Sequence, residues 1–124
     1  AQPLLADMSA AQHHVGLAGA GTALKLIANT LFGTQVALLA ELLGRMSEFG
    51  LAPAAAIELL GQTPLLSPTA KGAAALILAR QDDPMFPVEL VAKDFGYALN
   101  NTVTMPVSAA AAQVFHRAIA QGYG

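Results

Sequence analysis

The 124-residue chain lacks two residue types and has few charges, and each shortage excludes a class of protein. It contains no cysteine and no tryptophan. The absence of cysteine excludes a disulfide scaffold, a thiolate zinc site and a cysteine nucleophile. Charged residues make up 11% of the chain and the net charge is −2, which argues against nucleic acid as a partner. With 55% apolar residues, the chain also differs from a disordered segment.

Alanine and leucine dominate the apolar residues that are present, whereas β-branched and aromatic residues are few. Alanine and leucine favour the helix, and no segment shows the alternating pattern of a strand. The length corresponds to one domain. We therefore expect a single all-α domain.

One stretch predicts an unusually long helix over residues 22–49, because no proline interrupts it and Gly50 follows it as a stop signal. Its apolar residues recur at steps of three and four: Leu24, Ile27, Leu31, Leu38, Leu42 and Met46. A helix of this length in a small domain is expected to be the spine of a multi-helix bundle.

Proline and glycine mark the other boundaries. A short helix is expected within residues 1–10, and a glycine loop follows it up to Gly21. Asp83-Pro84 indicates a turn, and Ser67 is the expected N-cap of the helix that it precedes. The remaining helices are expected over Pro53 to Leu60, Pro68 to Arg80, Pro87 to about Thr102 and Pro106 to about Gln121.

The mean hydropathy of +0.53 raises the question of a membrane. The most apolar charge-free run, residues 26–40, is shorter than the ~20 residues of a spanning helix. We expect no membrane segment and no signal peptide. The low charge instead predicts that the domain buries part of its surface against a partner.

Lys25 and Asn29 are four residues apart and therefore share one face of the long helix. A first-turn position and apolar neighbours would disfavour the charged form of Lys25, as proton transfer requires. The alternative is a lysine whose stem covers apolar surface beside a tolerated asparagine.

Three other features carry weaker signals. The glycines at 16, 19 and 21 do not fit a dinucleotide loop, since no strand precedes them and position 24 is leucine, so they favour a close backbone approach. Lys93 and Asp94 by themselves indicate a solvated helix face. The histidines at 13, 14 and 116 lack the partners of a metal site, so we expect no metal.

Taken in order, four stretches resemble the β-hydroxyacid dehydrogenase family, which includes 3-hydroxyisobutyrate dehydrogenase and the glyoxylate and tartronate semialdehyde reductases. Residues 15–29 resemble its G-x-x-G-x-G-x-x-x-K-x-x-[N]-N signature. Ala40-Glu41 with Gly50-Leu51, the F-x-x-x-L-x-x-K-D segment over Phe86 to Asp94 and the closing Gly122-Tyr-Gly124 follow at similar distances. One departure is Ala28, where many relatives have a first asparagine.

The resemblance implies a cytoplasmic enzyme of two domains, of which this chain is the helical, C-terminal domain of a 6-phosphogluconate dehydrogenase-like fold. Residues 1–12 would end the inter-domain connection, 13–21 would form the glycine loop and 22–124 the helical core. The first residue is not methionine, which fits an excised domain or fragment without the N-terminal Rossmann domain.

By the same resemblance, Lys25 would be the catalytic lysine, Asn29 would bind substrate and Lys93 would contact the cofactor, NAD or NADP. The substrate would be a small hydroxy acid or semialdehyde. The partners would be the Rossmann domain and further copies of the chain, bound through helical faces. Alone, the chain is expected to be inactive. The alternative function is a helical dimerisation module without catalysis.

Overall fold

The computed structural model describes residues 13–81, 87–100 and 103–123, and these are the residues discussed below. The described chain is helical: α2 (Ala20–Met46), the 3₁₀ turn η1 (Ser47–Phe49), α3 (Pro53–Leu60), α4 (Pro68–Ala79), α5 (Val88–Leu99) and α6 (Pro106–Ala120). The expected all-α architecture around one long helix is confirmed. The helix expected within residues 1–10 and the turn at Asp83-Pro84 lie outside the described residues.

Helix α2 begins at Ala20, two residues earlier than expected, so Gly21 belongs to the helix and not to the loop. The glycines of the loop serve backbone conformation: Gly16 and Gly19 have φ values of 130° and 95°, which side-chain-bearing residues rarely adopt. A Cβ at Gly21 would lie 3.8 Å from Val15, an ordinary contact. The close backbone approach expected here is therefore wrong.

The other helix boundaries follow the prolines and caps. Helix α2 ends at Met46, three residues before the expected end, and the 3₁₀ turn Ser47–Phe49 continues the chain to Gly50, which is left-handed with φ 72° as predicted. Ser67 caps α4 as predicted: its Oγ accepts from the Ala70 N–H at 3.1 Å and donates to Oε1 of Gln35 at 2.6 Å. Helix α5 ends at Leu99, short of the expected Thr102.

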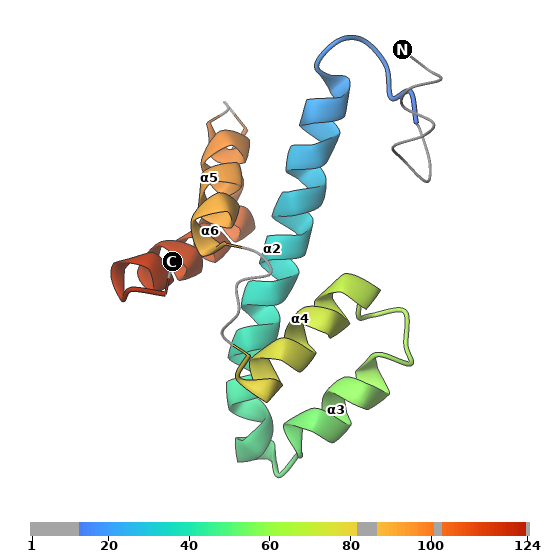
Figure 1. Ribbon diagram of the computed structural model, residues 1–124, viewed down its shortest axis with the longest axis vertical. Helices are drawn as coiled ribbons and strands as arrows, with labels where there is room; N and C mark the ends of the chain where they lie inside the picture. The colour runs from blue at the N-terminus through green and yellow to red at the C-terminus, as the bar shows by residue number, and fades with distance from the viewer. Residues whose placement is uncertain (1–12, 82–86, 101–102, 124) are drawn as a thin grey trace.

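The other helices pack on two sides of α2. Helices α5 and α6 lie beside one side of it, and α3 and α4 lie beside another, nearer its C-terminal end (Figure 1). Each pair encloses a small core. The α3–α4 core contains Leu39, Leu43, Met46, Ile57, Leu66, Ala70 and Ala74. The α5–α6 core contains Ala37, Val91, Phe95, Ala111 and Ala112.

A glycine in α2 allows α5 to approach closely. A Cβ at Gly33 would lie 2.7 Å from Cε2 of Phe95 and 3.1 Å from Cγ1 of Val91. Phe95 is 1% exposed, and its ring stacks on Phe115 with centroids 5.6 Å apart. The contact at Gly33 therefore fixes α5 against α2 one residue away from Asp94.

By length and composition alone, the helix over Ala20–Phe49 could cross a membrane, which the count of charge-free residues did not anticipate. Only 28% of its most apolar 18-residue window is buried within the structure. Core helices of soluble proteins can have the same length and composition.

Candidate functional site

The two functional residues expected on α2 and the one expected on α5 meet around Asp94. Asn29 Nδ2 donates a hydrogen bond to Asp94 Oδ2 at 2.5 Å. Lys25 Nζ lies 3.5 Å from the same oxygen, and Lys93 Nζ lies 3.9 Å from Oδ1. Lys25 and Asn29 come from successive turns of α2, and the close contact of α5 with α2 brings the other two residues to them. The structure thus joins residues that are 65 and 69 positions apart in the sequence.

Asp94 is the electrostatic centre of this cluster. The hydrogen bond from Asn29, assisted by the charges of Lys25 and Lys93, lowers the pKa of the Asp94 carboxyl below its ordinary value of 3.8. Burial acts in the opposite direction and is outweighed. The carboxylate is therefore ionised at neutral pH. Two ammonium groups against one carboxylate leave a net positive charge, which favours an anionic ligand.

Lys25 differs from the expectation in two respects. Its side chain is 62% exposed, so the apolar neighbours that were expected to disfavour its charged form do not enclose it. It is the sixth residue of α2 and so lies in the second turn, where the effect of the helix dipole is weaker than in the first. Its ammonium group is instead accessible to solvent, and the buried Asp94 carboxylate lies beside it. Lys93, at 50% exposure, is accessible as well.

Asp94 is the functional residue that sequence reasoning missed. The solvated helix face expected for it is wrong, because Asp94 is 6% exposed. A signal was present in the helical spacing: with Val91 and Phe95, Asp94 occupies the buried stripe of α5 at steps of three and four. An acidic residue in such a stripe requires partners, which Asn29 and Lys25 supply.

The described residues fit only part of a dinucleotide site. In them, no strand precedes a glycine-rich phosphate loop of the kind that binds a dinucleotide in a Rossmann domain. Lys25 and Lys93 are exposed and present positive charge to the solvent. No three acidic or histidine residues gather into a metal-binding group within the described ranges.

Comparison with known proteins assigns the chain to a family. Residues 19–124 match the family described as the NAD-binding domain of NADP-dependent 3-hydroxyisobutyrate dehydrogenase. The chain belongs to this family. The match confirms the resemblance found in the sequence, and with it the helical C-terminal domain of a 6-phosphogluconate dehydrogenase-like fold.

Two relatives of this 3-hydroxyisobutyrate dehydrogenase-family domain are much longer than the chain. The 2-(hydroxymethyl)glutarate dehydrogenase of Eubacterium barkeri is 33% identical over 99% of the chain and 42% of its own length. Glyoxylate/succinic semialdehyde reductase 1 of Arabidopsis thaliana is 30% identical over 90% of the chain and 40% of its own length. The chain therefore spans about two-fifths of these relatives.

Proposed function

We propose that this chain is the catalytic-lysine domain of an NAD(P)-dependent dehydrogenase that acts on a small hydroxy acid or semialdehyde. One observation carries the proposal. The Lys25 ammonium is held 3.5 Å from a buried carboxylate, yet 62% of the side chain is exposed on a face that a substrate can reach. A proton donor that is both fixed and accessible is what general acid–base catalysis requires.

Each residue of the cluster has a defined task. In reduction, Lys25 Nζ donates a proton to the carbonyl oxygen of the substrate, and in oxidation the neutral amine accepts the hydroxyl proton. When bound, the nicotinamide supplies or takes up the hydride. Asp94 pairs with Lys25 and fixes the position of Nζ. The Asn29 amide uses Nδ2 for Asp94, which leaves its carbonyl oxygen to accept from a substrate hydroxyl.

The net positive charge of the cluster agrees with a substrate that carries a carboxylate. Lys93 extends this charge toward the solvent, where we place the cofactor. The dinucleotide itself is bound mainly by a Rossmann domain outside this chain, so the chain alone does not turn over. The two relatives, named for a hydroxy acid and for semialdehydes, support this substrate class.

The test is steady-state kinetics on the protein in which this chain is joined to a nucleotide-binding domain, with glyoxylate and succinic semialdehyde as probes. Lys25→Ala is expected to lower kcat by ~10²–10⁴. Lys71→Ala is the matched control, since Lys71 also pairs with one carboxylate, Glu58 at 3.4 Å, but lies on α4. Near-normal kcat in Lys25→Ala would show that the assignment is wrong.

A positioning role for Asp94 has its own readout. Asp94→Asn keeps the size of the side chain but removes the charge that holds the Lys25 ammonium. We expect a lower kcat together with a shift of the pH profile for reduction, whereas a merely structural role would leave the profile in place.

The second candidate function, a helical self-association module without catalysis, is favoured by the exposed apolar residues of α2. In that case, substitutions at Lys25 and Asp94 would change no reaction rate or ligand affinity.

A further inference from the structure

A cavity of about 680 Å³ lies between α2, the end of α5 and the segment that leads into α6. None of the described residues that line it belongs to the cluster around Asp94. Leu26 lies in the cavity wall, and at 3.6 residues per turn it is about 100° around the α2 axis from Lys25. The cavity is therefore separate from the catalytic cluster, and its volume is in the range of small-molecule sites.

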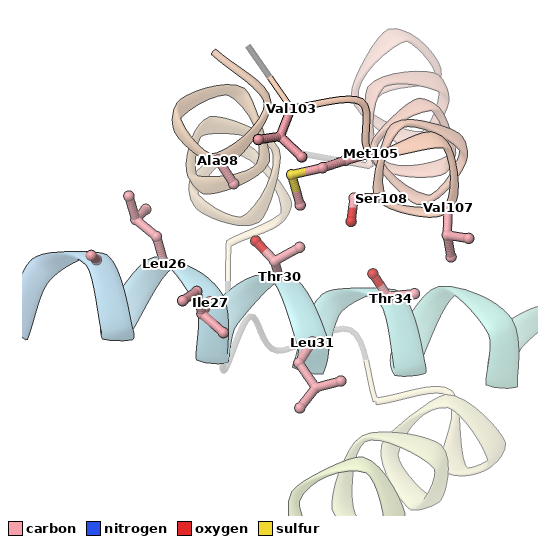
Figure 2. Close-up of a pocket in the computed structure, with 11 residues that line it drawn as sticks. Leu26, Ile27, Thr30, Leu31, Thr34, Ala98, Val103, Met105, Val107 and Ser108 are labelled. Atoms are coloured by element: carbon pink, nitrogen blue, oxygen red, sulfur yellow. The ribbon is translucent and has the colours of Figure 1, made fainter. Parts of the chain in front are cut away.

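The two ends of the cavity differ in polarity. Its lining on α2 runs from Ala23 to Thr34, about 16 Å along the axis at 1.5 Å per residue. Toward Ala23 the α2 lining is apolar, whereas toward Thr34 it carries the hydroxyls of Thr30 and Thr34. In Figure 2, these two side chains turn toward the α6 segment and the Ser108 hydroxyl turns toward α2, so the three hydroxyls converge. A polar end and an apolar end suit a ligand with one head group and an aliphatic chain.

The Thr30 hydroxyl needs a partner that the described residues do not supply. Thr30 is 7% exposed, and its Oγ1 has no hydrogen-bond partner among them. Burying a hydroxyl without a hydrogen bond is costly, and an oxygen atom of a ligand in the cavity would provide the missing bond. Figure 2 shows the Met105 side chain extending toward Thr30. Because a methionine side chain is unbranched and flexible, Met105 can turn aside and admit that atom.

The first turn of α6 adds hydrogen-bond donors at the same end. Pro106 is its first residue, and Met105 before it provides no side-chain cap. The Ala109 N–H already donates to the Met105 carbonyl at 2.9 Å. Helix geometry leaves the N–H groups of Val107 and Ser108 without a partner inside the helix, and both residues line the cavity. Uncapped N–H groups at the positive end of a helix dipole, with no acidic residue in the turn, favour a negatively charged oxygen.

We propose that this cavity binds an aliphatic monocarboxylate of medium chain length, such as a fatty acid. The carboxylate lies at the start of α6, where it accepts from the Ser108 N–H and from the hydroxyls of Thr30 and Ser108. The chain runs toward Ala23 and covers Ile27 and Val103, which are 64% and 69% exposed. Removing such apolar side chains from water favours binding.

The charge of the lining limits the ligand to one ionised group. No lysine or arginine occurs among the described residues that line the cavity. The helix dipole corresponds to about half an elementary charge, so together with neutral donors it can stabilise one carboxylate but not two. A dicarboxylate or a phosphate monoester is therefore excluded. This site goes beyond the proposed function and does not depend on it.

The methionine methyl groups make binding visible by NMR, since the chain has only four methionines. The chain with isotope-labelled methionine methyl groups is titrated with octanoate, and Met105→Leu identifies the Met105 signal. We expect a saturable shift of this signal. Met46 is the internal control, because it is buried in the α3–α4 core and its signal should stay in place.

Two variants test the contacts to the head group. Thr30→Val and Ser108→Ala each remove one hydroxyl, and each is expected to raise the dissociation constant of octanoate at least ~10-fold, as for a lost hydrogen bond to a charged group. Thr69→Val is the matched control, since Thr69 is exposed on α4 and outside the cavity lining. Thermal unfolding separates lost binding from lost folding: Thr30→Val removes an unpaired hydroxyl and should not destabilise the chain.

A ligand series tests the two ends of the site. Octan-1-ol keeps the chain but lacks the charge, so it is expected to bind about 3-fold more weakly than octanoate, or weaker still. From butyrate through hexanoate to octanoate, affinity is expected to rise about 4-fold for each methylene that enters the apolar end.

Four results would overturn the proposal. They are the lack of a saturable shift at Met105, equal shifts at Met46 and Met105, octan-1-ol binding as tightly as octanoate, and equal affinity of Thr30→Val and Thr69→Val for octanoate. The second result indicates detergent-like binding, and the third shows that no carboxylate lies at the start of α6. No hydride transfer is measured in these experiments, so their failure leaves the proposed function untouched.

Discussion

Replacing Gly33 by alanine tests the contact that places α5 against α2. The new Cβ would lie 2.7 Å from the Phe95 ring, whereas ordinary contact begins at 3.4 Å, so the ring or the helix has to move by about 0.7 Å. Phe95 cannot swing into solvent, because it is 1% exposed and stacks on Phe115. Overpacking of this kind costs about 1–3 kcal/mol. The better helix propensity of alanine offsets about 0.5–1 kcal/mol of this loss of stability.

Gly44→Ala is the matched control for this variant. It makes the same substitution in the same helix, but its Cβ meets nothing within 4 Å, so only the gain of about 0.5–1 kcal/mol remains. We therefore expect the unfolding free energies of the two variants to differ by about 1–3 kcal/mol, with Gly33→Ala the less stable. Urea unfolding followed by circular dichroism measures the difference. Equal stability of the two variants would refute the close contact, and with it the account of how Asp94 reaches Lys25.

Three further substitutions probe the stability of the fold. Thr30→Val is expected to stabilise the chain by about 1 kcal/mol in thermal unfolding, because the Thr30 hydroxyl is buried and has no hydrogen-bond partner among the described residues; a loss of stability would reveal an unseen partner. Ser67→Ala removes both the α4 cap and the bond to Gln35, and should cost about 1–2 kcal/mol in urea unfolding, whereas Ser67→Thr should retain most of it. Asp94 has a lowered pKa when folded, so its contribution to stability is present above pH 3.8 and is lost as the pH falls below it. The stability difference between wild type and Asp94→Asn should therefore shrink in acid, and a constant difference would contradict the ionised cluster.

Local sequence signals predicted the helices well because their boundaries are determined locally. Pro53, the Ser67-Pro68 pair and Pro106 each start a helix where expected, since proline fits the first turn and serine caps it. The start of α2 differed by two residues because the last left-handed residue of the loop is Gly19, which nothing distinguishes in the sequence from Gly21.

The site was predicted only in part, because its central contact is not local. Lys25 and Asn29 share a helix face by spacing alone, and the family resemblance added Lys93. The burial of Asp94 depends on α5 lying against Gly33, a contact between segments about 60 residues apart. The same limit applies to the long helix. Its apolar period places both Leu31 and Met46 on the apolar face, yet Met46 is buried and Leu31 is 72% exposed. Periodicity defines a face, and the neighbours decide whether that face is covered.

The α3–α4 core and the α5–α6 core share the long helix but no buried side chain. We therefore expect two cooperative units, α3 with α4 and α5 with α6, each packed on α2. Either unit can unfold locally while the core of the other stays packed. In hydrogen exchange, the amides of α3 and α4 are then expected to open as one group, with a free energy distinct from that of α5 and α6. Substitutions in the α3–α4 core can accordingly change the stability of the domain while leaving the geometry around Asp94 unchanged.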